Sequence, residues 1–278
     1  MKREIKLLFG AFCLLTTSAL LNACSSDDDE SLMTRSDGEK MAYDECLNIP
    51  HPEDTWVYPA YPGTAEWIEL HQRHADDIMG VINELMPPED VVKKMSTEGL
   101  VYSYIDYPYA SEYEAFAHEA YYAMVLSFAN SPFGQEMIRR SDSALRLTNI
   151  YKDFNSMCDD EDAQAWNVHS ILLRMMDVEE IHNQLSIEEK KEFIRTALDK
   201  LALENSDSAV AIHIAFTCGR IMKSAGYTPL LEAINTNDAM RIFLEHWTMV
   251  SYGDRGIDAI ISMASDFCGN SLRFFSVK

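Results

Sequence analysis

The sequence predicts an all-α protein, built either as an antiparallel helix bundle or as an α-solenoid-like stack of helix pairs. From Thr64 onward, apolar residues recur at helical spacing, and the stretches between these runs are short. Short connections favour antiparallel packing of consecutive helices. Apart from a candidate strand at 272–277, no segment of this body alternates apolar and polar residues as a strand would. We find no fixed repeat length, so the sequence does not predict a regular repeat protein.

Residues 1–23 are predicted to be a secretory signal peptide. Lys2 and Arg3 give a basic start, and the run from Leu7 to Leu21 forms an apolar core of 15 residues. A membrane-spanning helix needs roughly 20 apolar residues, so this run is short for a span. No later segment approaches that length. The sequence therefore predicts export without a transmembrane helix.

The signal peptide ends in Leu21-Asn22-Ala23-Cys24. This segment resembles the lipobox of bacterial lipoproteins, which has a large aliphatic residue three positions before the cysteine and a small residue directly before it. The resemblance implies that Cys24 carries a diacylglycerol on its thiol and a third acyl chain on its freed amine. The alternative is ordinary cleavage of a soluble secreted protein, which needs small residues at both flanking positions. Leu21 does not fit that pattern, so lipidation of Cys24 is favoured.

An acidic run, Ser25-Ser26-Asp27-Asp28-Asp29-Glu30, follows Cys24 directly. It resembles the tag that lipoproteins of the Bacteroidota carry for export to the outer face of the outer membrane. The resemblance implies a lipid-anchored outer-membrane protein exposed at the cell surface, with an outer-membrane transport protein as one candidate partner. The alternative is a solvated acidic run without such a role.

The chain is strongly acidic, with a formal net charge of −22. Such a charge repels phosphate backbones, which argues against nucleic-acid binding. Hydrophobic residues make up 47% of the chain, so there is enough apolar material for a sizeable core. The length suits one or two domains. The acidic stretch within 155–162 is the best candidate for a seam between two halves of the body.

Residues 24–63 are expected to form a tether that is acidic at first and then rich in proline, because four prolines between 50 and 62 prevent a helix. The helical body, 64–278, opens with a helix from Thr64 that ends before Pro87-Pro88, followed by a short helix from Pro88 and another capped by Ser96. Residues 88–109 resemble a pattern in helical exported proteins of the Bacteroidota whose function is not established. This resemblance implies no catalytic role.

Sequence signals for helix ends mark the later helices. Capping boxes begin at Ser111 and Ser186. A cap followed by proline, or a glycine suited to a helix end, occurs at Ser131-Pro132, Thr228-Pro229, Gly226 and Gly269. Further helices are expected over 144–154, 163–176, 208–223, 238–250 and 257–268.

Four cysteines remain beyond Cys24, namely Cys46, Cys158, Cys218 and Cys268. They could pair in three ways, and none lies in a C-x-x-C spacing that would indicate a zinc or redox motif. Cys218 and Cys268 lie in apolar helical patterns, where a cysteine is usually a small buried thiol. We therefore expect core thiols in preference to a disulfide.

A cluster of tyrosines is the most unusual feature of the composition. Tyrosine combines a flat apolar ring with a hydroxyl group, which suits stacking on a sugar ring or a tetrapyrrole. The candidate ligand-binding residues are those expected to be exposed around Pro108, together with the aromatic residues of the tether: Tyr102, Tyr104, Tyr107, Tyr109, Trp56, Tyr58 and Tyr61. The alternative, which we favour, is that aromatic residues at helical spacing pack in the core.

Two pairs of residues could contribute to a metal site if their helices lay side by side. His71 and His74 are three residues apart, and Glu114 and His118 are four apart, so each pair can face one direction. Such pairs are common on solvated helix faces, and we expect no metal or cofactor. The remaining candidates with apolar neighbours are predicted to be core histidines: His169, His213 and His246.

These observations favour binding over catalysis, since no nucleophile-elbow, phosphate-loop or dinucleotide-binding motif is present. The predicted function is that of a lipid-anchored surface protein that captures a small-molecule nutrient, either a glycan or a tetrapyrrole. One alternative is a hydrolase that uses histidine and carboxylate groups, with or without a metal. The other is a structural adhesin or assembly protein.

Overall fold

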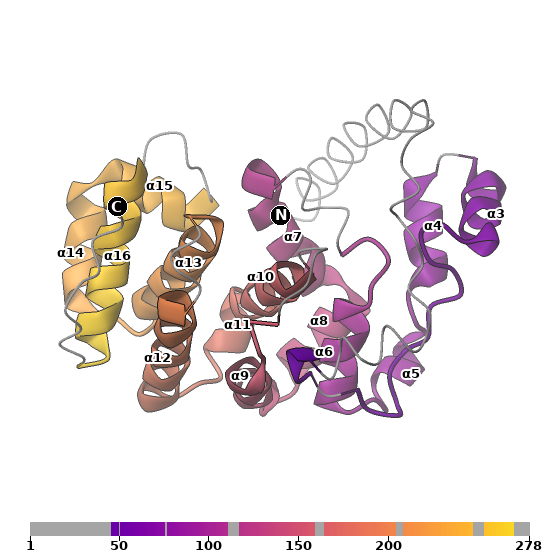
Figure 1. Ribbon diagram of the computed structural model, residues 1–278, viewed down its shortest axis with the longest axis horizontal. Helices are drawn as coiled ribbons and strands as arrows, with labels where there is room; N and C mark the ends of the chain where they lie inside the picture. The colour runs from indigo at the N-terminus through magenta and orange to yellow at the C-terminus, as the bar shows by residue number, and fades with distance from the viewer. Residues whose placement is uncertain are drawn as a thin grey trace.

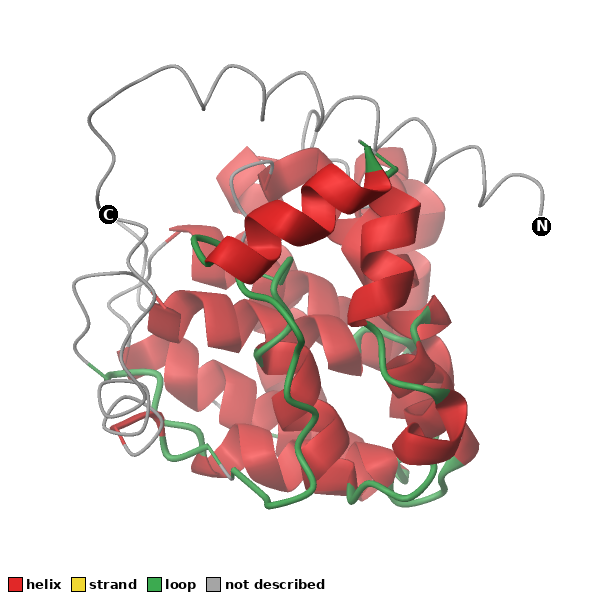
Figure 2. Cartoon of the chain, turned by 90° about the vertical axis from the view of Figure 1, so that its right-hand side faces the viewer, coloured by secondary structure: helices red, strands yellow, loops and turns green. Residues whose placement is uncertain are grey.

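A computed structural model describes residues 46–49, 51–75, 77–110, 117–158, 164–203, 208–246 and 253–269. Within these ranges the chain forms helices and loops and contains no strand, which confirms the all-α prediction (Figure 2). The candidate strand at 272–277 lies outside them. The helices are arranged broadly in chain order along the long axis of the molecule, with α3 at one end and α14 and α16 at the other (Figure 1). This order fits the stack of helices and not the closed bundle.

The stack begins with two helices where the sequence predicted one. Helix α3 spans Ala65–His74 and helix α4 spans Ile78–Leu85. Ala75 ends α3 in the left-handed region, with φ of 46°. The apolar spacing that would have continued the helix is interrupted between Leu70 and Ile78, so no core contact holds the intervening turn in helical form.

The remaining helices form two series with the same order, each opening with a helix of four residues. The first half of the body contains α5 (Glu89–Val92), α6 (Thr97–Ile105), α7 (Ala117–Asn130), α8 (Pro132–Arg139), α9 (Ser143–Asp153) and α10 (Gln164–Met176). The second half contains α11 (Glu179–His182), α12 (Ile187–Leu203), α13 (Ser208–Ser224), α14 (Thr228–Thr236), α15 (Asp238–His246) and α16 (Gly253–Phe267). Both α8 and α14 carry proline in their first turn.

The opening turns of the two halves share their backbone hydrogen bonds. In each half, five successive amides donate hydrogen bonds to carbonyls at matching positions, and the two sets are ninety residues apart. The first bond of the first set, Val91 N to Pro88 O, corresponds to Ile181 N to Val178 O in the second set. Both segments then lead to a serine, Ser96 or Ser186, directly before a helix. The chain therefore contains an internal correspondence that our search for a fixed repeat did not find.

The capping predictions are largely confirmed. The hydroxyls of Ser96 and Ser131 accept hydrogen bonds from the amides of Gly99 and Gly134, and Ser186 forms a capping box with Glu189. Gly226 and Gly269 follow helix ends with φ of 69° and 72°. Helix α14 begins at Thr228 itself, with Tyr227 before it as the N-cap residue. The capping box expected at Ser111 lies outside the described residues.

Residues 46–49 and 51–63, here called the strap, pack against the helices, and the part that leads into α3 crosses one end of the molecule (Figure 2). Leu47, Ile49, Tyr58 and Ala60 belong to the hydrophobic core. The strap is therefore part of the folded body, although it belongs to the segment predicted as tether. Its aromatic residues Trp56, Tyr58 and Tyr61 all pack against the core.

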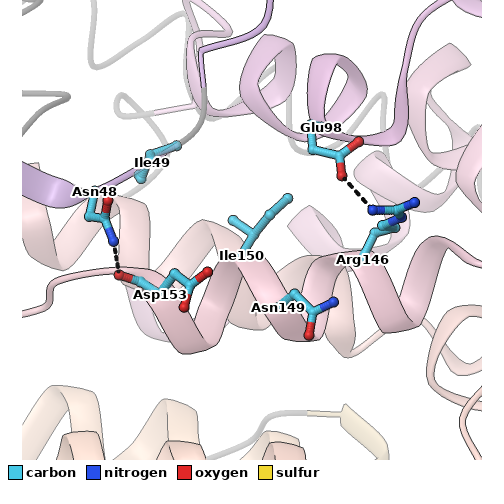
Figure 3. Close-up of a pocket in the computed structure, with 7 residues that line it drawn as sticks. All are labelled: Asn48, Ile49, Glu98, Arg146, Asn149, Ile150 and Asp153. Carbon is cyan, nitrogen blue, oxygen red and sulfur yellow. Dashed lines mark hydrogen bonds and ion pairs between the residues drawn. The ribbon is translucent and has the colours of Figure 1, made fainter.

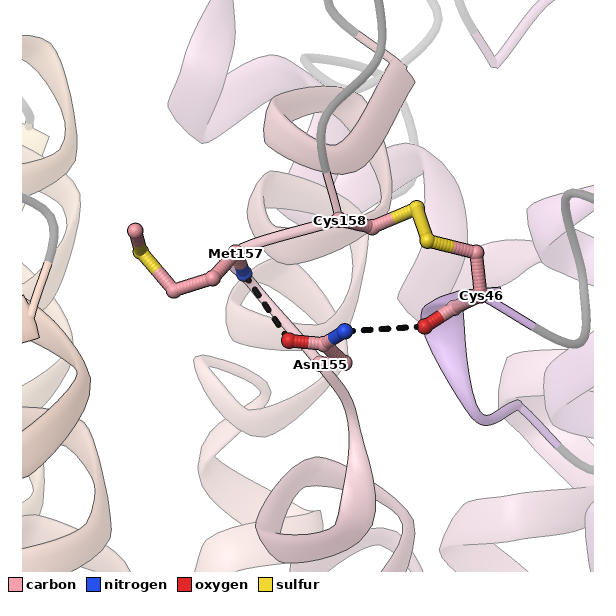
Figure 4. The surroundings of a disulfide bond; sticks show 4 residues. All are labelled: Cys46, Asn155, Met157 and Cys158. Atoms are coloured by element: carbon pink, nitrogen blue, oxygen red, sulfur yellow. Dashed lines mark hydrogen bonds between the residues drawn. A yellow bond between two sulfur atoms is a disulfide. The ribbon is translucent and has the colours of Figure 1, made fainter.

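A disulfide joins Cys46 to Cys158 (Figure 4). The preference for core thiols is therefore wrong for this pair, although Cys218 and Cys268 are buried thiols as predicted. The amide of Asn155 donates to the carbonyl of Leu47 at 2.7 Å, and its side chain donates to the carbonyl of Cys46 at 3.0 Å. These contacts bring together cysteines 112 residues apart, a proximity that no local sequence pattern indicates.

The candidate seam at 155–162 falls between α9 and α10, which pack against each other. Only residues 155–158 of it are described, and they carry the disulfide partner Cys158. Among the described residues, none of the helices combines the length and the apolar character that crossing a membrane requires.

Candidate functional site

The tyrosines proposed as an exposed ligand platform are buried. Five of these tyrosines are between 2% and 7% exposed, namely Tyr58, Tyr102, Tyr104, Tyr107 and Tyr109. Trp56 and Tyr61 are partly buried. The favoured interpretation, that these rings pack in the core, is therefore the observed arrangement, and the exposed platform that the ligand-binding interpretation needs is not formed.

The reason for this burial lies in α6, most of whose residues face other elements. The ring of Tyr104 packs against Phe128 of α7 at 4.6 Å between centroids, and Tyr107 packs against Tyr58 of the strap at 5.7 Å. The hydroxyl of Tyr58 donates to the carbonyl of Ser103 at 2.6 Å. Burial raises the pKa of Tyr104 to about 12, so its hydroxyl stays neutral. These rings join the strap to the stack.

The histidines proposed as metal ligands already have protein partners. The ring of His71 lies 2.8 Å from the Tyr109 hydroxyl and 2.9 Å from the carbonyl of Trp67, and the ring of His74 lies 2.7 Å from Glu84. Glu114 and the side chain of His118 lie outside the described part of the chain. Within that part, no group of three or more histidine, cysteine, aspartate or glutamate residues is arranged to hold a metal ion.

Two of the three histidines predicted to be in the core are buried. His169 and His213 are buried, and the ring of His169 lies 2.7 Å from the hydroxyl of Tyr151. His246 is exposed at the end of α15, so the prediction for it is wrong. The apolar residues before it in sequence, Phe243 and Leu244, are buried, but His246 is the last residue of α15 and lies beyond them.

A cleft of about 330 Å³ lies between the strap, α6 and α9, and we call it the strap cleft (Figure 3). Most of the residues that line it have charged or amide side chains, and two are isoleucines: the lining residues are Asn48, Ile49, Glu98, Arg146, Asn149, Ile150 and Asp153. Ile150 rises from α9 toward the space between Ile49 and Glu98 (Figure 3). Ile49 and Ile150 are only 7% and 5% exposed, and polar and apolar atoms contribute about equally to the surface that lines the cleft.

Helix periodicity places the α9 side of the cleft. Arg146, Asn149, Ile150 and Asp153 are three or four residues apart, so they share one face of the helix. Arg146 forms an ion pair with Glu98 of α6 at 3.5 Å. The side chains of Asn149 and Asp153 have no hydrogen-bond partner among the described residues. The cleft therefore offers a free amide and a free carboxylate beside a guanidinium group.

The strap side of the cleft depends on one unusual backbone conformation and on the disulfide. Asn48 has φ of 54°, in the left-handed region that asparagine adopts more readily than most residues. Its side-chain amide donates to the carbonyl of Asp153 at 2.8 Å. The disulfide of Cys46 fixes the chain two residues earlier. The strap wall of the cleft is thus fixed by two bonds, the disulfide at Cys46 and the hydrogen bond from Asn48 to the carbonyl of Asp153.

A smaller hollow of about 130 Å³ lies where the strap meets α3 and α4. Three glutamates line it, and two of the basic groups nearby are engaged, because Arg73 and His74 both contact Glu84, at 2.9 and 2.7 Å. The hydrogen bond from His74 lowers the pKa of Glu84. This hollow offers less room than the strap cleft.

None of the residues that line the strap cleft is predicted from the sequence as a site residue. A polar face on α9 is visible in the sequence, since Arg146, Asn149 and Asp153 recur at helical spacing opposite buried Leu147 and Tyr151. Such a face is ordinarily solvated, and only the long-range contact with Asn48 turns it into the wall of a cleft. No family model, curated protein or solved structure matches this chain.

Proposed function

We propose that this protein is a lipid-anchored protein of the outer membrane that displays its helical body at the cell surface and binds a polar ligand there. The proposed address rests on the lipobox ending at Cys24 and on the acidic run that follows it. The Cys46–Cys158 disulfide supports export, because such bonds persist mainly in oxidising compartments. It is the structural observation on which this part of the proposal depends.

The proposed anchor is sufficient to hold the protein on a membrane. Each buried methylene of an acyl chain contributes about 0.8 kcal/mol, and several chains give stable attachment where one does not. Residues 24–45 separate the anchor from the strap. At about 3.4 Å per residue, they allow the body to reach at most about 75 Å from the membrane surface.

Replacement of the proposed lipidated cysteine tests the anchor. Cys24→Ala should abolish labelling of the protein by radioactive fatty acid and release the body from the membrane fraction. Cys13→Ala, within the signal peptide, is the matched control and should leave both unchanged. Protease added to intact cells should remove the body of the unaltered protein. Labelling that persists in Cys24→Ala, or a body protected until the outer membrane is broken, would contradict the proposal.

The strap cleft supports a glycan in preference to a tetrapyrrole as the ligand. Amide, carboxylate and guanidinium groups can donate to and accept from neighbouring hydroxyls, and Asn149, Asp153 and Arg146 present all three on one face of α9. A tetrapyrrole would need a broad apolar surface, whereas the two isoleucines of the cleft are almost fully covered. The net charge of −22 further favours a neutral glycan over an acidic one.

A thermal-shift panel of neutral oligosaccharides, haemin and divalent metals on the full mature chain tests this ligand class. A ligand present at 100 times its Kd adds about 2.7 kcal/mol to the stability of the folded chain. A neutral oligosaccharide should raise the Tm of the unaltered chain and of an Asp266→Ala control, but not that of Asn149→Ala/Asp153→Ala. A shift with haemin alone, or one that survives the double substitution, would overturn the assignment of the cleft. Tight stoichiometric metal would favour the hydrolase alternative.

A further inference from the structure

Asp177 occupies the point where the two halves of the body meet. It lies between the end of α10 and the start of α11, and it is completely buried. The hydroxyl of Tyr121, from α7, donates to its Oδ2 at 2.6 Å. Its other oxygen, Oδ1, has no hydrogen-bond partner among the described residues. A buried carboxylate with one unpartnered oxygen is costly when ionised, because burial removes the water that would otherwise solvate the charge.

Charged and titratable groups face Asp177 from each helix around it. Arg174 precedes it on α10, but the Arg174 guanidinium also bonds to the carbonyl of Ser170 and to the sulfur of Met124. The other groups around the carboxyl are Tyr121 of α7 and Thr217, Cys218 and Arg220 of α13. His182 of α11 lies near Arg220 and Lys190. His213 of α13 packs on the ring of Tyr121 at 4.5 Å. Asp177 is thus the one acidic side chain in this set.

Hydrogen bonding at this junction is incomplete in more than one place. Four buried side-chain nitrogen or oxygen atoms of the described residues have no partner, and three of them belong here: Asp177 Oδ1, His182 Nε2 and Arg220 Nε. Native proteins rarely leave buried polar atoms unpaired without a functional or structural reason. Their concentration at one junction makes it the least satisfied part of the described interior.

The corresponding position of the first half carries no charge. Ninety residues before Asp177 stands Pro87, and ninety residues before His182 stands Val92, which is buried in the core. The shared turn geometry therefore does not require these polar groups. Asp177 instead contacts the first half through Tyr121 and faces α13 of the second half, which packs against α10.

We propose that the protonation state of Asp177 sets how firmly the second half of the body packs against the first, with the neutral carboxyl giving the tighter junction. Protonation removes the buried charge and converts Oδ1 from an unpartnered acceptor into a hydroxyl that can donate. Ionisation leaves a carboxylate between two sets of helices, where Tyr121, Thr217 and the nearby arginines offset only part of its loss of water. The junction then loosens.

The direction of the pH dependence follows from the shift at Asp177. Burial raises the pKa of Asp177 to about 7, although the charge of Arg220 and the hydrogen bond from Tyr121 act in the opposite direction. A raised pKa stabilises the fold at low pH, and this stabilisation is lost as the pH rises through about 7. Burial lowers the pKa of His182 to about 4, so its own contribution has the opposite sign and is lost on acidification below its ordinary value.

Because the two residues oppose each other, the test compares a variant with the unaltered chain. Asp177→Asn keeps the shape of the side chain but cannot ionise, and His182 is present in both proteins. Measured on the full mature chain, the Tm of Asp177→Asn minus that of the unaltered protein should increase by several degrees between pH 5.5 and 8.5. Glu180→Gln, at an exposed position of α11, is the matched control and should show a constant difference. A constant difference for Asp177→Asn would overturn the proposal.

A second measurement on the unaltered chain places the effect and does not require the variant to fold. Amide hydrogen exchange, corrected for the intrinsic effect of pH, should be several-fold faster at pH 8 than at pH 6 in α11 and α13. Exchange in α3 and α4, at the far end of the stack, should not change (Figure 1). An equal change in every helix, or none at the junction, would contradict a role for Asp177 in holding the two halves together.

Discussion

The two halves of the body begin with the same turn and the same serine, but they obtain the carboxylate that completes the cap from different places. In the second half, Glu189 lies three residues after Ser186, and its carboxylate accepts from the amide and hydroxyl of Ser186, both at 2.7 Å. In the first half, Gly99 occupies the position that corresponds to Glu189. There, Asp54 of the strap accepts from the amide of Ser96, and also from its hydroxyl at 2.9 Å.

The comparison shows that one structural requirement can be met locally or by a distant segment. The absence of a side chain at Gly99 makes room for Asp54, since a Cβ atom there would lie 2.5 Å from the Asp54 carboxylate. The cap of α12 therefore stabilises only its own helix. The cap of α6 also fixes the strap, which carries one wall of the strap cleft at its other end.

The largest effect is expected from breaking the covalent attachment of the strap, for which the second half has no counterpart among the described residues. Replacing Cys46 and Cys158 by serine should lower the free energy of unfolding by about 2–5 kcal/mol, because the disulfide closes a long loop in the unfolded chain. Urea unfolding measures this change. Reductant should destabilise the unaltered protein to a similar extent and leave the double variant unaffected, and equal sensitivity of the two proteins would contradict it.

The effect of Gly99→Ala on the free energy of unfolding should change sign when Asp54 is removed, which would sharpen the comparison. Gly99→Ala should destabilise the unaltered protein by about 1–3 kcal/mol, since the new methyl group meets the Asp54 carboxylate. In an Asp54→Ala background the obstacle is gone, and the same substitution should stabilise by about 0.5–1 kcal/mol through its effect on helix formation. In a Glu189→Ala background it should still destabilise, which makes that variant the control. Equal effects in all three backgrounds would refute the proposed competition for space.

Removal of either capping carboxylate should lower the stability of the fold moderately, but the two removals should affect different parts of the chain. Asp54→Ala and Glu189→Ala should each cost about 0.5–2 kcal/mol, the usual range for the loss of a cap. Only Asp54→Ala should also increase hydrogen exchange in the strap, at the amide of Trp56, which donates to Ser103 at 2.8 Å. Faster exchange there in Glu189→Ala would show that the two caps are not independent.

The smallest effect is expected in acid. Hydrogen bonds from Ser186 lower the pKa of Glu189, so the ionised carboxylate stabilises the cap above its ordinary pKa of 4.5, and this contribution is lost as the pH falls through the lowered value. The amide of Ser186, corrected for the intrinsic effect of pH, should then exchange faster as the solution is acidified below the ordinary pKa of Glu189. Glu189→Gln should remove this pH dependence, and a variant that retained it would exclude Glu189 as the titrating group.

Helix positions and caps could be predicted from the sequence because their causes are local. The spacing of Phe193, Ala197 and Leu201 and the capping box at Ser186 identify α12 without any tertiary information. The break at Ala75 was missed because apolar spacing on either side of it fits one helix or two. Secondary structure is therefore predicted poorly wherever the local sequence fits two arrangements equally well.

The strap, the disulfide and the strap cleft could not be predicted, because each depends on residues far apart in the chain. Asn48 and Asp153 are 105 residues apart, and the cysteines of the disulfide are 112 residues apart. The tyrosines of α6 were recognised as unusual, but their spacing fits a buried face as well as an exposed one. The weak correspondence between the two halves became visible only through the matching hydrogen bonds at 88–95 and 178–185.

The position of the disulfide also determines how the body would respond to mechanical force. Of the described residues, Cys46 lies nearest in sequence to the proposed membrane anchor, so tension transmitted from that side would reach it before any other described residue. The covalent bond would pass that tension to Cys158, just beyond the end of α9. Asn48, which is hydrogen-bonded to Asp153, follows Cys46 in the chain, so the disulfide would carry the tension before it reached this hydrogen bond. The strap cleft would therefore keep its shape if the preceding chain were pulled in flowing liquid.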